Sequence, residues 1–127
     1  MPLSDRDVAY LMDMLNCSQD IIAFTSELTF EEFQSDRMRR LATERQLEVL
    51  GEAANHVSEQ ARSQISSIPW SRVVGLRNKL AHDYGEVLAE RVWQIAKEHV
   101  QNLRDALAAL DEVSNATRPG DESTNDS

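Results

Sequence analysis

Apolar residues recur at spacings of three, four and seven along most of this chain, which is the pattern of amphipathic α-helices. Glycine and proline, the residues that most often interrupt helices, occur only four and three times in 127 residues. The pattern contains no convincing strand and no internal repeat. It therefore predicts an all-α protein, and the length fits one domain plus some tail.

The expected helices are separated by short segments that carry capping and turn-forming residues. Ser4 can cap the first helix, Thr29 can cap a short helical turn, and Ser35 or Asp36 can cap the second long helix. Gly85 is the expected stop of the third helix. Short connections make successive helices antiparallel, so we expect an up-down antiparallel bundle of four to five helices. The expected spans are residues 4–27, 30–33, 36 to between 57 and 63, 69–83 and 87–110.

Gly51 falls inside the second long helix, where glycine costs about 1 kcal/mol relative to alanine. A glycine at such a position is compensated when another backbone approaches the helix closely. We therefore expect a close helix contact at Gly51.

Acidic residues outnumber basic ones, 22 against 13, which gives a formal net charge of −9. The imbalance persists in residues 1–111, which hold 18 acids and 12 Lys or Arg. An acidic body argues against passive, charge-driven binding of nucleic acid, so any such contact must come from a local basic patch. Residues 112–127 are acidic and polar without apolar periodicity. We expect a helical domain over 1–111 followed by a disordered acidic tail over 112–127.

Cysteine, histidine and glycine usage limits the chemistry open to the chain. Cys17 is the single cysteine, so no intrachain disulfide can form, and its apolar surroundings predict a small core or interface residue. His56 and His99 have no partner at metal-ligand spacing, and no glycine-rich phosphate loop is present.

No apolar run reaches transmembrane length, and no signal-peptide pattern opens the chain. We expect a soluble cytoplasmic protein without membrane contact, metal or cofactor.

One stretch concentrates chemically capable side chains, because Arg77, His82 and Tyr84 lie within eight positions. Arginine offers a permanent charge with forked donors that suit a phosphate, and histidine moves a proton near neutral pH. Tyrosine adds a hydroxyl that can bind, donate or be modified. Together these side chains could cleave RNA without a metal, with a 2′-hydroxyl attacking the adjacent phosphate. The supporting candidates in the same stretch are Asn78, Lys79 and Asp83.

Helix geometry limits how these side chains can meet. At 100° per residue, His82 points about 140° away from Arg77, whereas Tyr84 points almost the same way as Arg77 if helix geometry persists to Tyr84. One helix face therefore cannot gather all three. Either the chain leaves helix geometry near His82, or two copies share the site across a two-fold axis. Lys79, on another face, would add positive potential, and Asp83 is expected to be mainly solvated.

Each of these residues also has a purely structural explanation. The helix dipole alone favours a histidine in the last turn of a helix. An arginine seven residues before a tyrosine can form a stacked surface pair. Spacing by itself therefore leaves a catalytic and a structural role both open.

The stretch resembles the signature of the HEPN superfamily, and more narrowly that of HepT-like toxins. These toxins are small helical ribonucleases encoded beside a minimal nucleotidyltransferase antitoxin of the MntA type. The resemblance extends in consistent order over about residues 4–110. Beyond the stretch itself, it is carried by Leu28 to Phe33, Leu47 to Ala53, Ile68 to Trp70, Gly75 to Asn78, and Val92 with Trp93.

The resemblance implies a homodimer with a composite cleft, and metal-independent RNA cleavage with Arg77 and His82 as catalytic residues. It also implies that the nucleotidyltransferase antitoxin adenylylates Tyr84. The attached AMP would bring bulk and negative charge to the place where an RNA phosphate should sit, and so block the cleft.

Two other functions remain open on the sequence. A non-catalytic helical subunit could bind a nucleotide through Arg77 and regulate the nucleotidyltransferase, and the acidic composition favours this alternative. A plain structural dimer could use the motif only to stabilise its interface.

Overall fold

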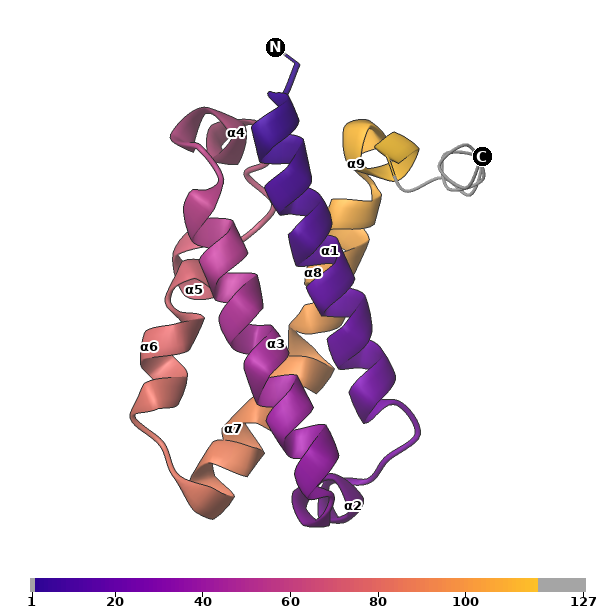
Figure 1. The fold of residues 1–127 in the computed structure, drawn as a ribbon, viewed down its shortest axis with the longest axis vertical. Coiled ribbons are helices and arrows are strands. Elements are labelled where there is room, and N and C mark those ends of the chain that lie inside the picture. The colour runs from indigo at the N-terminus through magenta and orange to yellow at the C-terminus, as the bar shows by residue number, and fades with distance from the viewer. Residues whose placement is uncertain (1, 117–127) are drawn as a thin grey trace.

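The computed structural model describes residues 2–116, and these residues form nine helices and no strand. This confirms the prediction of an all-α protein. The longest helices lie at the N-terminal half, and the C-terminal half is divided into shorter pieces (Figure 1). The helices are α1 (Asp5–Thr25), α2 (Phe30–Ser35), α3 (Arg37–His56), α4 (Glu59–Gln64), α5 (Trp70–Val74), α6 (Leu76–Ala81), α7 (Gly85–Glu98), α8 (Val100–Ala108) and α9 (Asp111–Ala116).

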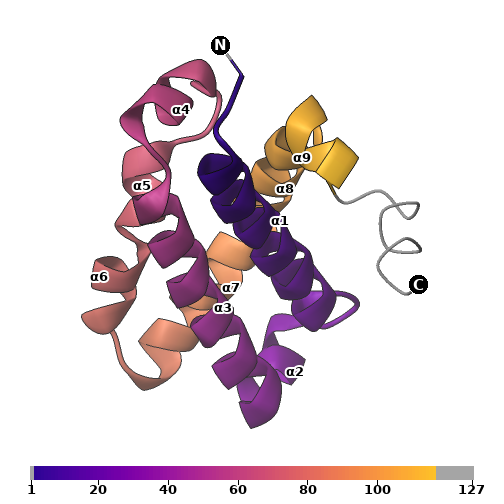
Figure 2. The ribbon, with the colours of Figure 1, turned by 45° about the horizontal axis from the view of Figure 1, so that its top comes forward.

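The helices form four antiparallel arms. Figure 1 shows α1 running down the molecule, α3 returning beside it, α5 and α6 descending, and α7 and α8 rising again. α1 packs against both α3 and α8, while α5 and α6 pack on the other side of α3. The rotated view in Figure 2 shows α7 and α8 crossing behind α1 and α3. The predicted up-down bundle is therefore confirmed.

Leucine and isoleucine side chains from these arms make one continuous core. Leu11 and Ile21 of α1, Leu47 of α3 and Leu107 of α8 are fully buried. Each such side chain contributes about 1.5–3 kcal/mol when it is removed from water. Phe33 of α2 is also fully buried and lies 5.2 Å from the ring of Trp93, so α2 closes one end of the bundle.

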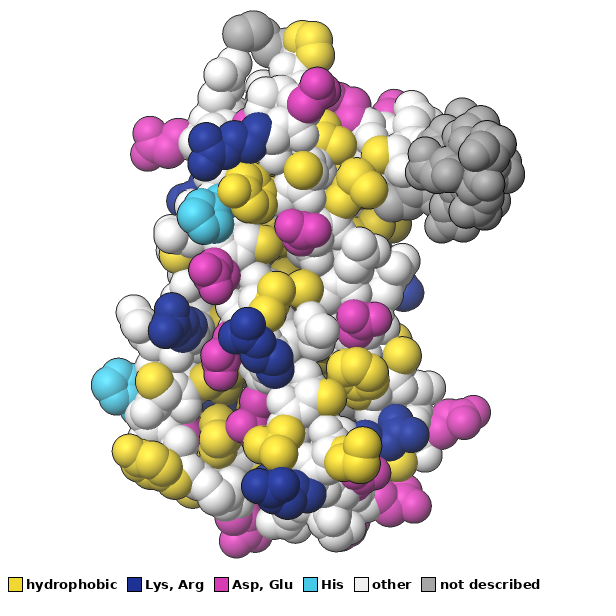
Figure 3. Space-filling model, viewed as in Figure 1, with side chains coloured by type: hydrophobic (Ala, Val, Ile, Leu, Met, Phe, Trp, Pro, Cys, Tyr) yellow, Lys and Arg dark blue, Asp and Glu magenta, His cyan; other side chains and the backbone are white. Residues whose placement is uncertain are grey.

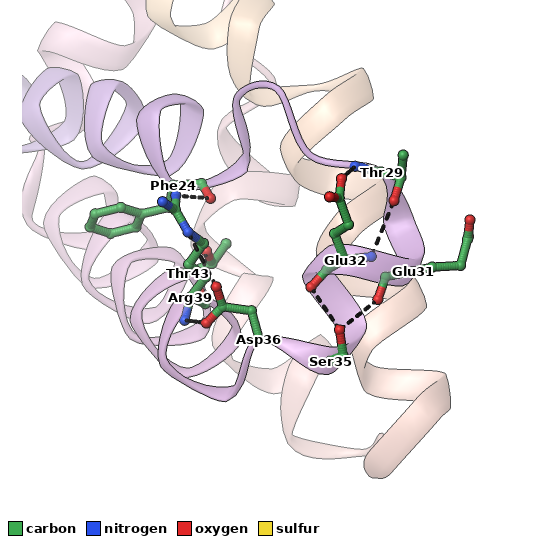
Figure 4. Close-up of polar contacts among 8 residues, drawn as sticks. All are labelled: Phe24, Thr29, Glu31, Glu32, Ser35, Asp36, Arg39 and Thr43. Atoms are coloured by element: carbon green, nitrogen blue, oxygen red, sulfur yellow. Dashed lines mark hydrogen bonds and ion pairs between the residues drawn. The ribbon is translucent and has the colours of Figure 1, made fainter.

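The link from α1 to α3 is fixed by side-chain caps, shown in Figure 4. Thr29 and Glu32 form a reciprocal capping box at the start of α2. The Asp36 carboxylate accepts from the Arg39 amide at the start of α3, and the Arg39 side chain donates to the Phe24 carbonyl. The predicted caps at Thr29 and Asp36 are confirmed, and they turn the chain back along α1.

The expected third and last helices are each interrupted once. The third is divided at Gly75, whose amide donates to the carbonyl oxygens of Ser71 and Val73, and it ends at Ala81. The last starts at Gly85 and bends at His99, where φ is −120°. The prediction of two uninterrupted helices was wrong because apolar periodicity continues across both breaks, while backbone hydrogen bonding does not.

α4 was not predicted as a separate helix, because the second long helix was expected to end between residues 57 and 63. Ser58 caps α4, and its amide and hydroxyl donate to the Asp7 carboxylate of α1 at 2.9 and 2.7 Å. These bonds join residues 51 positions apart in the chain. A six-residue helix is marginal by itself, so this tertiary tie decides its presence.

Part of the segment that was expected to be a disordered tail is helical. Residues 111–116 form α9, in which Val113 is fully buried and the Glu112 carboxylate accepts from the Leu3 amide at 2.9 Å. The expectation of disorder is therefore wrong for residues 112–116, because Val113 packs into the core. Residues 117–127 of the expected tail lie outside the described residues, and the domain division itself stays a prediction.

Gly51 makes the close contact that the sequence predicted. A Cβ atom at this position would lie 3.0 Å from the Val73 carbonyl oxygen and 3.6 Å from the Leu76 Cβ. The missing side chain thus lets the α5–α6 pair lie directly on α3. The expected close approach is confirmed, and it positions the helix that carries Arg77.

Gly51→Val is expected to lower the free energy of unfolding by about 1–3 kcal/mol, because overpacking against a backbone carbonyl cannot be relieved by a rotamer change. Urea denaturation of both proteins measures the difference. Glu52→Val, at the exposed neighbouring position, is the matched control for the helix propensity of valine. Equal losses in the two variants would contradict a steric origin at Gly51.

The Asp7 carboxylate makes stability depend on pH. Burial raises the pKa of Asp7, but the hydrogen bonds from Ser58 and Ser4 and the charge of Arg6 outweigh burial, so the pKa is lowered overall. A lowered carboxyl pKa stabilises the fold above the unfolded-state value of about 3.9, and this contribution is lost as the pH falls through the folded-state pKa.

Asp7→Asn is therefore expected to lower the free energy of unfolding by about 1–2 kcal/mol at neutral pH and by less near pH 3, which lies below the unfolded-state pKa. Urea titrations of both proteins at the two pH values measure the effect. Asp13→Asn, an exposed carboxylate on the same helix, serves as the control. A loss of the same size at both pH values would mean that the charge of Asp7 is not what stabilises the α1–α4 contact.

Candidate active site

Arg77, Asn78 and Lys79 are exposed on α6, which is held by two buried leucines. Leu76 and Leu80 lie one helical turn apart and point into the core, so the opposite side of the helix faces solvent. The helix in turn rests on α3 at Gly51. The candidate arginine therefore projects from a short, anchored helix.

His82 is the C-terminal cap of α6 and keeps helical backbone angles, with φ −90° and ψ −8°. Its side chain is exposed. Because the helical backbone persists as far as His82, its side chain diverges from that of Arg77 by about 140°. The structure thus does not bring the two side chains onto one face of one chain. α6 ends at Ala81 and Tyr84 is extended, so the chain does leave helix geometry near His82, which is one of the two arrangements that the sequence left open. This departure follows His82 and does not turn its side chain toward Arg77.

Tyr84 lies beyond the end of α6 and not on its face. Its backbone is extended, with φ −135° and ψ 157°, and it precedes the first turn of α7. Tyr84 and Arg77 would share a helix face only if helix geometry persisted to Tyr84, and this condition is not met, since α6 ends three residues before Tyr84. The tyrosine side chain is 82% exposed, and Gly85 follows with φ +54°, a left-handed angle that glycine adopts without strain.

Asp83 is held by Arg91 of α7, whose guanidinium donates to its carboxylate. The Asp83 side chain is mostly buried, so the expectation that it is mainly solvated was wrong. The ion pair ties the turn after His82 to α7 and thereby fixes the direction of the chain between the histidine and the tyrosine. The sequence contains no local signal for Arg91, because the pair spans the turn between two helices.

Comparison with known proteins identifies the family. The model of the family described as "Ribonuclease HepT-like" matches residues 14–110, which include α6, His82 and Tyr84. The chain belongs to the HepT-like ribonuclease family. The resemblance to HepT-like proteins within the HEPN superfamily is thereby confirmed.

Named relatives agree with this assignment. "Putative RNase MJ1380" of Methanocaldococcus jannaschii is 38% identical over 103 residues, which cover 80% of this chain and 94% of the relative. "Putative RNase MJ0127" of the same organism is 39% identical over 98 residues, covering 76% of this chain and 81% of that relative. "Probable ribonuclease HepT" of Thermococcus cleftensis is 33% identical over 110 residues, which cover 87% of this chain and 98% of that relative. No solved structure matches the chain.

The surface of this HepT-like chain carries mixed charge on the face drawn in Figure 3. Lys and Arg side chains alternate there with Asp and Glu, and no broad basic area forms. Arg39 and Arg45 are paired with Asp36 and Glu48. Binding of RNA over this face would therefore gain little from bulk electrostatics.

Within residues 2–116, no group of three or more His, Cys, Asp or Glu side chains is arranged to hold a metal ion. No helix in the same range combines the length and hydropathy that crossing a membrane requires.

Proposed function

We propose that this HepT-like chain is a metal-independent endoribonuclease toxin whose catalytic cleft forms between two copies of the chain. Arg77 and His82 are the catalytic residues in this proposal. The observation that carries it is the exposure of both side chains on one anchored helix, with about 140° between them. A two-fold axis beside α6 would oppose the Arg77 of each copy to the His82 of the other.

A dimer is also supported by apolar side chains that remain exposed in the single chain. Met38 of α3 is 83% exposed and Val87 of α7 is 56% exposed. Met38 is in the first turn of α3 and Val87 is in the first turn of α7. Both helices begin at the lower end of the molecule in Figure 1, where the connection from α6 to α7 also lies. Exposed apolar side chains of this size favour burial against another protein surface.

The chemistry follows from the two side chains. The RNA 2′-oxygen attacks the adjacent phosphorus, so that a bond from the 2′-oxygen to phosphorus forms and the bond to the 5′-oxygen breaks. The His82 imidazole of one copy takes the proton of the 2′-hydroxyl, and a water molecule supplies a proton to the departing 5′-oxygen. Arg77 stabilises the charge that develops on the phosphorane oxygens. The products are a 2′,3′-cyclic phosphate and a 5′-hydroxyl.

The end groups of the RNA test this proposal. Purified protein is incubated with a labelled single-stranded RNA in excess EDTA, and we expect cleavage that leaves a 2′,3′-cyclic phosphate. A matched RNA with a 2′-deoxynucleotide at the cleaved position should resist cleavage there, since the nucleophile is missing. Products with 3′-hydroxyl and 5′-phosphate ends, or cleavage abolished by EDTA, would contradict the mechanism.

Tyr84 is the proposed site of regulation by a minimal nucleotidyltransferase antitoxin. Its exposed hydroxyl is accessible to a modifying enzyme, and it follows His82 by two residues. Adenylylation would place a negative phosphate and a nucleoside next to the catalytic residues, which would repel and exclude the RNA backbone.

Tyr84→Phe is expected to retain most of the RNA cleavage while escaping inhibition by the co-expressed nucleotidyltransferase. Growth, RNA integrity and the intact mass of the protein are measured with and without that partner. Tyr10→Phe is the matched control, because Tyr10 is half-buried against His56 and should leave the modification unchanged. Neutralisation of Tyr84→Phe together with an added AMP mass would place the modification on another residue.

A second candidate is a non-catalytic subunit that binds a nucleotide and regulates the nucleotidyltransferase. The net charge of −9 favours it, because an acidic protein gains little from the RNA phosphates. This function predicts binding of ATP or AMP that requires Arg77, together with intact RNA in the cleavage experiment. Calorimetry with each nucleotide distinguishes it from the nuclease.

A further inference from the structure

A cavity of about 560 Å³ opens between the α5–α6 pair and the α7–α8 pair, and we call it the α5–α8 groove. Its floor is apolar and includes Leu50, Leu76 and Leu103 from three different helices. Its polar lining includes Arg72, Lys79, His99 and Asn102. An apolar depression with a few polar groups around it is typical of a site for a small planar ligand.

The charge around the α5–α8 groove is opposite to that of the whole chain. The chain has 22 acidic residues against 13 Lys and Arg, yet none of the described residues that line the groove is acidic. Arg72 and Lys79 are exposed, and neither takes part in an ion pair within residues 2–116. The groove therefore offers two uncompensated positive charges beside an apolar floor. A nucleotide, with a flat base and an anionic phosphate, has the complementary chemistry.

Helix geometry connects the groove with the catalytic histidine. His82 follows Lys79 by three residues, so the two side chains lie about 60° apart on the same side of α6. Along the axis of α6, Lys79 is about 4.5 Å before His82. Arg72 lies on α5 and lines the same groove as Lys79. Lys79 therefore both lines the groove and lies on the side of α6 that carries His82, so the groove is next to the proposed site of cleavage.

We propose that the α5–α8 groove binds one nucleotide of the RNA substrate close to the scissile phosphate. The base lies on the apolar floor, and the neighbouring phosphates contact Arg72 and Lys79. The inference rests on the proposed nuclease function and names its substrate class as single-stranded RNA, because a base must be unpaired to enter the groove.

Affinity for RNA can be measured separately from cleavage in the His82→Ala background. Fluorescence anisotropy with a labelled single-stranded RNA of about ten nucleotides is recorded over a range of KCl concentrations. We expect Arg72→Gln and Lys79→Gln each to weaken binding about three- to tenfold and to reduce the salt slope by about one. Arg45→Gln is the matched control, because Arg45 is exposed, lies outside the groove and gives the same charge change. It should alter neither value.

The contribution of the base is tested with the RNA itself. A single abasic nucleotide is moved along the oligonucleotide, and we expect affinity to fall about tenfold at one position. The same sequence as a fully paired duplex should bind more weakly than the single strand. Equal affinity for every abasic RNA, or tighter binding of the duplex, would overturn the assignment of a base to the groove.

The remaining outcomes separate the inference from the function on which it rests. If the parent binds RNA and Arg72→Gln binds it equally well with the same salt slope, the groove assignment is wrong and the nuclease proposal stands. If the parent binds no RNA, both fail. If sedimentation shows that Arg72→Gln or Lys79→Gln converts a dimer into monomers, the groove is an interface between copies, and the nucleotide assignment is wrong.

Discussion

His82→Ala is expected to lower the rate of RNA cleavage by about two to four orders of magnitude, the usual contribution of a positioned general acid or base. His82 is exposed at the end of α6, so alanine removes the imidazole without leaving a cavity in the core. The free energy of unfolding should change by less than about 0.5 kcal/mol. Initial rates on a labelled RNA, together with urea denaturation, measure both effects.

His56→Ala provides the matched control for His82→Ala. His56 is also exposed, but it ends α3 and stacks on Tyr10 with 5.0 Å between the ring centroids. The His56→Ala protein should cleave RNA at close to the normal rate. Cleavage by His82→Ala at the normal rate would exclude His82 from the reaction and leave the general base to another side chain.

Arg77→Ala is expected to lower cleavage by about two to three orders of magnitude, because the developing phosphorane charge loses its donor. A composite cleft makes a stronger prediction for mixtures. When Arg77→Ala and His82→Ala proteins are unfolded together in equal amounts and refolded, about half of the dimers should be mixed. Each mixed dimer would keep one intact pair of Arg77 from one copy and His82 from the other. The mixture should then recover about a quarter of normal activity.

The recovery experiment has two controls. Each variant is unfolded and refolded by itself, and neither should gain activity. Arg77→Lys, which keeps the charge but loses the forked donors, should retain more activity than Arg77→Ala. A mixture as inactive as its components would mean that each site is built within one chain, and the shared cleft would have to be abandoned.

Local sequence patterns predicted the helices of the N-terminal half well. The caps at Ser4, Thr29 and Asp36 accept from the backbone as expected, because capping depends on residues three positions apart. The close contact at Gly51 was also predictable, since a glycine in the middle of a helix lowers stability unless another backbone approaches it closely. Such features are encoded within one or two turns of helix, and they need no knowledge of the rest of the fold.

The sequence predicted which residues make up the candidate active site, but it did not predict how they are arranged in space. The sequence identified Arg77, His82 and Tyr84, and it limited their arrangement through the 100° advance of the helix. It did not predict that α6 ends at Ala81, which removes Tyr84 from the face of Arg77. It also missed Arg91, whose ion pair with Asp83 fixes the turn between the histidine and the tyrosine.

The sequence by itself therefore determined the all-α class, the up-down order of the helices and the stretch that carries the candidate chemistry, because all three follow from local periodicity and residue type. Only the tertiary structure decided the breaks at Gly75 and His99, the helix α4 and the burial of Val113. The helix α4 and the burial of Val113 depend on contacts between residues far apart in the chain, as in the hydrogen bonds from Ser58 to Asp7. Such contacts outweigh local preferences because short helices and single backbone hydrogen bonds are only marginally stable alone.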